Sequence, residues 1–305
     1  MQMNPILRNE LKLHARTVRL PIILVIYNLV LSCVAVLFMA SIQNQYQSGY
    51  PIQYDELMEI FTILGWIQCV LVCFMVPILT ASAIAGEREK QTLDIMLTTS
   101  ISPFSIILGK LVAAMCTVCI LVLSSVPILS ISFLFGGMSW KDMIAFLFVV
   151  IAIGVFVGSI GLFFSSLVKK TPVAIVLTFL VLGIVIIGTV AFFPIANAIY
   201  ETITYDRIEG TMKSLEFGWA SLLMIVNPVV LFLDFMEKSS GRIGVANYFN
   251  SWFGVASSSD IYTFAEHWWI VVSLLIQIGL ALLFLMGAAF FINPLKGKKG
   301  KNKEQ

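Results

Sequence analysis

The chain has 305 residues, of which 59% are hydrophobic and 12% are charged. Charged residues make up about a quarter of an average soluble domain, so this composition excludes an ordinary water-soluble protein. The net charge of +2 is too small to indicate a nucleic-acid partner. The charges lie in short clusters between long uncharged segments, which indicates a membrane protein with several spans.

Six segments contain no Asp, Glu, Lys or Arg, at residues 20–54, 60–86, 111–140, 143–168, 171–200 and 267–295. Each exceeds the roughly 20 apolar residues that a helix needs to cross the hydrocarbon core. Spanning segments must pair their backbone groups internally, and the alternation of a membrane β-barrel is absent. We therefore predict an all-α integral membrane protein whose transmembrane domain, residues 20–295, has six transmembrane helices, at about 20–41, 60–85, 104–135, 142–167, 172–195 and 267–292.

The distribution of basic residues predicts the orientation. With both termini in the cytoplasm, the inward segments contain 14 of the 19 Lys and Arg residues, and the first outward loop contains none. Lys and Arg concentrate on the cytoplasmic side of membrane proteins. We therefore expect a multi-pass protein of a bacterial cell membrane, with a basic cytoplasmic tail at 296–305 and an extracellular segment at 196–266.

Residues 217–235 are apolar enough to suggest a seventh span. A seventh span would send the basic tail outside, and Asn227-Pro228 interrupts the apolar run at its middle. We interpret this segment as re-entrant or extracellular helices before the last span, packed against protein where they enter the membrane.

The first 19 residues read as a basic amphipathic helix. Its charged residues include Arg8, Glu10, Lys12 and Arg16, and its leucines and isoleucines fall broadly on one side. Such a helix lies in the inner interface of a membrane, where it contacts lipids. A docking surface for a cytoplasmic partner and a simple positively charged anchor explain the same pattern.

The sequence offers no constellation for catalysis. The two histidines, His14 and His267, fall on opposite sides of the predicted membrane, which excludes a two-histidine metal site. The chain also lacks the G-x-x-x-x-G-K-[ST] loop that binds ATP phosphates. We therefore expect no enzyme activity, no metal and no cofactor bound by this chain.

Polar and small residues inside the predicted spans indicate helix packing. Asn28, Gln68 and Gln277 are the notable polar side chains, and each is more typical of an interhelical hydrogen bond than of a substrate contact. The fourth span carries a face of small residues that permits close helix contact, formed by Gly154, Gly158 and Gly161.

The inward loop after the second span is the most informative segment. From residue 85 it reads AGEREKQTLDIMLTTSISPFSIILGKL, with a charge cluster at 87–90, apolar residues up to Leu97, and a new helix starting at Ser102-Pro103. A surface helix that keeps apolar residues in water is typical of a protein docking site. A merely solvated charge cluster is the alternative.

This stretch resembles the signature of membrane subunits of type-2 ATP-binding cassette exporters, roughly G-E-[RK]-[ED]-x-[GQ]-T-[LI]-[ED]-x-L-L-[ATS]-[TS]-P followed by a helix ending in GK. The sequence departs from it at residues 100–102. The N-terminal helix and the six spans resemble the same family. The resemblance implies a cytoplasmic coupling helix that docks on an ATPase subunit, formed by Gly86, Glu87, Arg88, Glu89, Thr92, Leu93 and Leu97.

The resemblance also implies a function. The chain would be a permease subunit that acts as a homodimer or with a paralogous permease, and ATP and Mg would bind to separate ATPase subunits. An uncharged pathway suits a hydrophobic or amphipathic substrate better than an ion or a sugar. The alternative is a membrane scaffold or sensor that transports nothing, with the extracellular segment as its recognition part.

Overall fold

The computed structural model describes residues 19–48, 54–93, 102–131, 139–204, 218–253 and 259–292. These residues form helices joined by short turns, with no strand among them. Within this part of the chain six helices are long and apolar enough to cross a membrane, at Leu20–Gln47, Glu59–Glu89, Pro103–Leu129, Trp140–Leu167, Thr171–Tyr200 and Asp260–Ile292. The predicted all-α membrane fold with six spans is confirmed.

The chain divides into two compact units. Unit 1 comprises residues 1–179 and 279–305, and unit 2 comprises residues 180–278. The division falls within two long helices, α9 (Thr171–Gly183) and α13 (Asp260–Ile292), so each of these helices contributes to both units. The units are described separately below.

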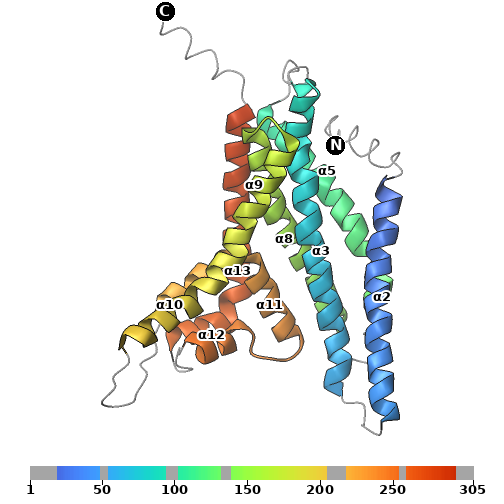
Figure 1. Ribbon diagram of the computed structural model, residues 1–305, viewed down its shortest axis with the longest axis vertical. Helices are drawn as coiled ribbons and strands as arrows, with labels where there is room; N and C mark the ends of the chain where they lie inside the picture. The colour runs from blue at the N-terminus through green and yellow to red at the C-terminus, as the bar shows by residue number, and fades with distance from the viewer. Residues whose placement is uncertain are drawn as a thin grey trace, which may run out of the picture. The chain divides into compact units, whose positions relative to one another are not determined.

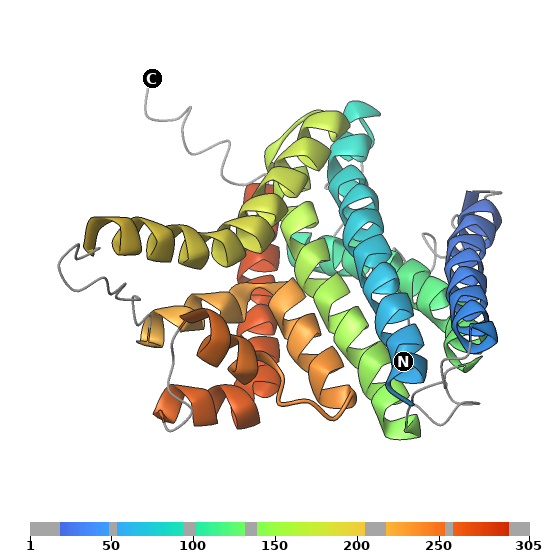
Figure 2. The same ribbon diagram turned by 60° about the horizontal axis from the view of Figure 1, so that its bottom comes forward.

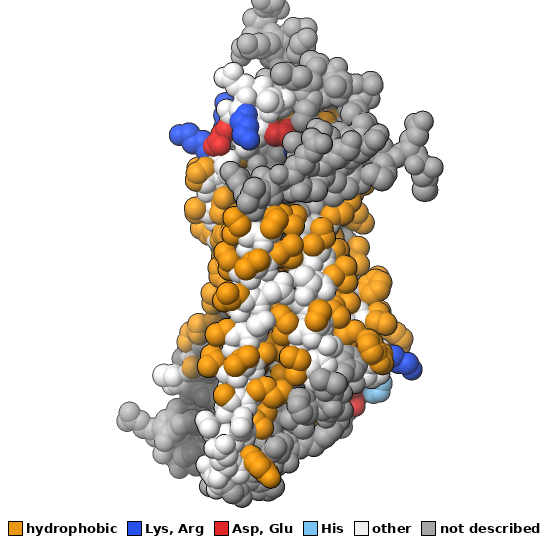
Figure 3. Space-filling view, turned by 90° about the vertical axis from the view of Figure 1, so that its right-hand side faces the viewer, with side chains coloured by type: hydrophobic (Ala, Val, Ile, Leu, Met, Phe, Trp, Pro, Cys, Tyr) orange, Lys and Arg blue, Asp and Glu red, His pale blue; other side chains and the backbone are white. Residues whose placement is uncertain are grey.

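Unit 1 is organised around α3 (Tyr54–Glu89). This helix contacts α2 (Arg19–Gln47), α5 (Pro103–Ser124) and α8 (Trp140–Leu167), and it runs side by side with α8 in both ribbon views (Figures 1 and 2). Hydrophobic side chains lie over the middle of the face shown in Figure 3, while charged side chains cluster at its upper end and a few more lie at its lower right edge. This distribution is the one that a lipid environment requires.

The glycines of α8 bring it close to α3, as the sequence predicts. A Cβ atom on Gly158 would lie 3.2 Å from Val76 and 3.0 Å from Leu111. A Cβ atom on Gly161 would collide with the hydroxyl of Thr80 and lie 3.3 Å from the backbone nitrogen of Ala81. Close approach of two backbones stabilises membrane helix pairs because lipid supplies no hydrophobic driving force between them.

We expect Gly161→Ala to destabilise the protein by about 1–2 kcal/mol, because overpacking against the α3 backbone outweighs the gain in helix propensity. The measurement is unfolding of the full chain in mixed micelles by denaturant titration. Gly279→Ala is the matched control: its added Cβ would meet nothing within 4 Å. It should stabilise the protein by about 0.5–1 kcal/mol. Equal effects of the two substitutions would contradict a tight α3–α8 contact.

The third span is interrupted near its end. The helix α5 stops at Ser124, and a four-residue helix, α6 (Val126–Leu129), follows Ser125. Pro127 has no N–H group and its ring clashes with the carbonyl four residues earlier, which disfavours a continuous helix here. The hydroxyl of Ser124 donates to the Leu121 carbonyl at 2.7 Å, and Ser125 Oγ lies 2.8 Å from the Val122 carbonyl oxygen. The break therefore concentrates polar groups inside a span.

Unit 2 contains the short helices that precede the last span. A π-helical turn at Ile184–Gly188 leads into α10 (Thr189–Thr204), and η2 (Gly218–Val226), α11 (Pro228–Ser239) and α12 (Val245–Phe253) follow. Their core includes Phe193, Phe249 and Trp269, all fully buried, and the rings of Phe249 and Trp269 meet edge to face at 5.1 Å. Residues 218–253 thus pack as several short helices, none of which is a candidate span.

Asn227 forms the predicted break between η2 and α11. Its side-chain oxygen caps α11 by accepting from Val229 N at 2.8 Å. Its amide nitrogen donates to Ile186 O at 3.0 Å and to Thr189 Oγ1 at 2.7 Å. A π-helical turn leaves carbonyl groups without their usual helical donors. Asn227 therefore joins the helix break to the π-helical turn of the fifth span.

Candidate functional site

The candidate site lies where α3 ends, directly before the described residues stop at Leu93. Thr92 N donates to Glu87 O at 3.0 Å and Gln91 N donates to Arg88 O at 3.1 Å. Gln91 takes the left-handed conformation, with φ 58°. This pair of bonds is the Schellman arrangement that ends a helix, with Gln91 where glycine is usual. The loop that follows is therefore anchored by a defined helix end.

Glu87 pairs with Lys110 of α5. The Lys110 ammonium nitrogen lies 2.6 Å from Glu87 Oε1, and the side chains are 3% and 24% exposed. A buried ammonium requires a paired anion because removing it from water is costly. The other carboxylate oxygen of Glu87 is buried and has no hydrogen-bond partner within the described part of the chain. The pair fixes the end of α3 to the beginning of α5.

Arg88 binds the end of α8. Its guanidinium donates to Ser166 O at 3.1 Å and to Val168 O at 3.2 Å. The last carbonyl groups of a helix have no partner within the helix, and a cation there is also favoured by the helix dipole. Arg88 thus caps α8 with a side chain that belongs to α3.

Glu89 binds the beginning of α9. Its carboxylate accepts from Thr171 N at 2.8 Å and from Thr171 Oγ1 at 2.9 Å. Free N–H groups and the helix dipole both favour an anion at the N-terminus of a helix. Three successive residues, Glu87, Arg88 and Glu89, therefore connect the end of α3 to three other helices of unit 1.

Ser165 of α8 also forms hydrogen bonds with the backbone of the last turns of α3. Its hydroxyl accepts from Ile84 N and Ala85 N, at 3.0 and 2.9 Å, and donates to Ala81 O at 2.6 Å. Ala81, Ala85 and Ala174 are fully buried against one another beside this bond. We call the set Glu87, Arg88, Glu89, Lys110, Ser165 and Thr171 the α3 junction.

The structure places the predicted docking residues in different surroundings. Glu87, Arg88 and Glu89 all have partners inside the chain, and Leu93 is buried. Gly86 is half-buried and Thr92 is exposed, next to the exposed Lys90 and Gln91. Leu97 and the predicted interface-helix residues Arg8, Glu10, Lys12 and Arg16 lie outside the described residues. Of the described residues at this end of α3, Lys90 to Thr92 are exposed, and Glu89 is exposed with its carboxylate bound to Thr171.

Sequence reasoning missed three members of the junction: Lys110, Ser165 and Thr171. Lys110 carried a signal, because a single base within an otherwise apolar span needs an anion nearby. Ser165 and Thr171 carried none, since a serine or threonine at a span end is ordinary. Within the described residues no three or more His, Cys, Asp or Glu side chains could hold a metal ion together.

Six apolar helices and a charged junction at one end of unit 1 define a multi-pass α-helical membrane protein. The model of one protein family, described as ABC-2 family transporter protein, matches residues 5–291 of the chain. The chain therefore belongs to the ABC-2 transporter family, as the sequence resemblance indicated, and is a permease subunit of an ABC transporter that works with ABC ATPase subunits. No individual curated protein gives a significant match.

Proposed function

We propose that the chain is the permease of an ABC exporter that moves a hydrophobic or amphipathic substrate, as a homodimer or with a paralogous permease. ATP and Mg bind to separate ATPase subunits, and this chain catalyses no reaction itself. Both termini and the α3 junction face the cytoplasm, because this orientation places most Lys and Arg residues inside.

The α3 junction is the observation that carries the proposal. The loop that resembles a coupling helix continues directly from α3, and the charged residues at its base bind α5, α8 and α9. A displacement imposed on this loop by an ATPase subunit therefore acts on four helices together. In this proposal Glu87, Arg88 and Glu89 transmit the movement, while Lys90, Thr92 and Leu97 contact the partner.

Purification from the native membrane tests this assignment. An affinity-tagged full chain should co-purify with an ABC ATPase subunit, identified by mass spectrometry, and show ATP hydrolysis that the chain alone lacks. Lys90→Glu combined with Leu97→Asp should reduce the recovered ATPase subunit about tenfold, which corresponds to a loss of about 1.4 kcal/mol. Arg242→Glu changes another exposed cation and is the control. Undiminished recovery with the first variant would rule out docking at this loop.

The second candidate within this family is a subunit that assembles with the ATPase subunits as a scaffold or sensor and moves no substrate; unit 2, which has a hydrophobic core of its own, would serve recognition. Reconstitution separates the two functions. A permease with its ATPase subunits should move an amphipathic fluorescent probe across proteoliposomes only when ATP is present. A scaffold would give no ATP-dependent movement of any probe while still recovering the ATPase subunit.

A further inference from the structure

A second group of polar side chains lies inside the membrane-spanning part of unit 1. Asn28 of α2 donates from Nδ2 to Ser124 Oγ and to Leu24 O, both at 2.9 Å. Gln68 of α3 accepts at Oε1 from Ser125 Oγ at 2.9 Å. The serines are those of the break between α5 and α6, so the group joins three spans. Sequence analysis expects such bonds from Asn28 and Gln68, and the structure shows them.

The hydrogen bonds of this group are incomplete. Asn28 Oδ1 and Gln68 Nε2 are buried and have no partner among the described residues, while the buried Tyr27 hydroxyl beside them has only a poorly aligned contact with Ser125. Tyr27 is 3% exposed and Gln68 is fully buried. A buried polar atom without a partner costs about 1–3 kcal/mol, and lipid offers it none. Two such atoms on adjacent helices, beside the Tyr27 hydroxyl, indicate a group that is bound there.

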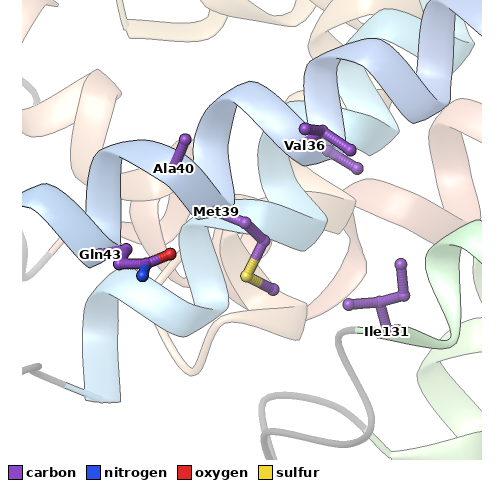
Figure 4. A pocket seen from close by; sticks show the side chains of 6 residues that line it. Val36, Met39, Ala40, Gln43 and Ile131 are labelled. Atoms are coloured by element: carbon purple, nitrogen blue, oxygen red, sulfur yellow. The ribbon is translucent and has the colours of Figure 1, made fainter.

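An apolar groove lies along the same side of α2. Its volume is about 270 Å³, and its lining is Ala35, Val36, Met39, Ala40, Gln43 and Ile131 (Figure 4). Met39 and Gln43 project from α2, and Ile131 faces them from the chain beyond α6. Asn28 precedes Ala35 by seven residues, which is about 10 Å along a helix. The polar cluster and the groove are therefore close enough for one molecule to reach both.

We propose that α2, α3 and the α5–α6 break bind an uncharged amphipathic molecule, with its hydroxyl or amide group at Tyr27, Asn28 and Gln68 and its hydrocarbon chain in the groove. The unpaired atoms set the chemistry: Gln68 Nε2 needs an acceptor, Asn28 Oδ1 needs a donor, and the Tyr27 hydroxyl serves as either. A hydroxyl or a primary or secondary amide supplies both functions, whereas an ester or an ether supplies acceptors alone.

The surroundings exclude a charged head group. The cluster consists of five neutral side chains, Tyr27, Asn28, Gln68, Ser124 and Ser125, and an ion in a membrane interior needs a counter-charge. The unpaired atoms have no exposed surface, so the bound group enters when α2 moves away from α3. The helix α2 is suited to this movement, because only 17% of its most apolar window is buried in the chain.

Native mass spectrometry of the detergent-purified full chain tests the proposal. It compares the binding of two neutral lipids. 1-Monooleoylglycerol presents two hydroxyls, while methyl oleate has the same hydrocarbon chain and no donor. Wild-type protein should bind the first at concentrations about tenfold lower than the second, the effect of about one well-placed buried hydrogen bond. Tyr27→Phe and Gln68→Met should each remove this preference. Ala40→Phe fills the groove and should weaken the binding of both lipids.

Gln277→Met is the matched control, because it removes another buried amide from a different span and should keep the preference. Equal binding of the two lipids to wild type, or a preference that survives both Tyr27→Phe and Gln68→Met, would show that only water occupies the cluster. Should Gln68→Met fail to fold, Tyr27→Phe alone decides, since it keeps the ring. This binding needs neither ATP nor an ATPase subunit, so its test is independent of the proposed function. Only the claim that the bound molecule is a transported substrate rests on the proposed function.

Discussion

Lys110→Met will destabilise the protein by about 3 kcal/mol, the lower end of the range for breaking a buried ion pair, because Glu87 is partly hydrated. Methionine keeps the length and the apolar stem of lysine but leaves the Glu87 carboxylate without its cation. The loss should be measured as the change in the free energy of unfolding of the full chain in mixed micelles.

The double variant Lys110→Met with Glu87→Gln separates the pair from the packing around it. It leaves no unpaired buried charge, so it should recover at least half of the lost stability. Glu89→Gln is a control at the same helix end: Glu89 is exposed and binds only a helix N-terminus. Its substitution should cost clearly less stability than Lys110→Met, because solvent screens an exposed charge. A double variant no more stable than Lys110→Met would mean that the ion pair does not hold the junction.

The spans were predictable because one physical requirement dominates them. A segment that crosses lipid must be apolar and helical for about 20 residues, and this requirement is visible in any single segment. The break at Asn227-Pro228 was predictable for a similarly local reason, since asparagine favours the N-cap position and proline the first turn of a new helix. The limits of the helices were less predictable: α13 begins at Asp260, several residues before the uncharged run that starts at His267. A helix continues past the apolar run wherever water or protein satisfies its charged side chains.

The partners of the charged residues could not be predicted. The sequence shows Glu87, Arg88 and Glu89 as a charge cluster, which is equally compatible with a docking surface and with internal bonds. Their partners Lys110, Val168 and Thr171 lie 23, 80 and 82 residues away, so only the fold brings them together. The motif therefore has two parts, a base bound within the chain and a following segment from Lys90 onward, which we propose contacts the ATPase subunit.

Unit 2 contains a second buried ion pair, and it depends on a glycine. Asp234 is fully buried; its Oδ2 lies 2.8 Å from the Lys238 ammonium, and its Oδ1 accepts from Val245 N at 2.7 Å. Burial raises the pKa of the Asp234 carboxyl, while the bonds from Lys238 and Val245 act in the opposite direction. Lys238 also donates to Ala265 O at 3.4 Å. The pair thus joins α11, α12 and α13.

Gly244→Ala will destabilise the protein by about 3 kcal/mol. Gly244 has φ +83°, a conformation that costs a residue with a Cβ atom about 1–2 kcal/mol. The added Cβ would also collide with Asp234 Oδ1 and lie 3.0 Å from Lys238 Cε, so the turn must move away from the ion pair. Overpacking of this kind costs about 1–3 kcal/mol. The measurement is the same unfolding titration in mixed micelles.

Gly241→Ala isolates the contribution of the ion pair. Gly241 has a nearly equal φ of +74°, but its added Cβ would meet nothing within 4 Å. Its substitution should therefore cost only the backbone strain, about 1–2 kcal/mol. The excess loss in Gly244→Ala measures how rigidly Asp234 and Lys238 hold the turn between α11 and α12. Equal losses of stability for the two variants would mean that Asp234 and Lys238 move aside at no cost. The core around Phe249 and Trp269 alone would then keep these helices together.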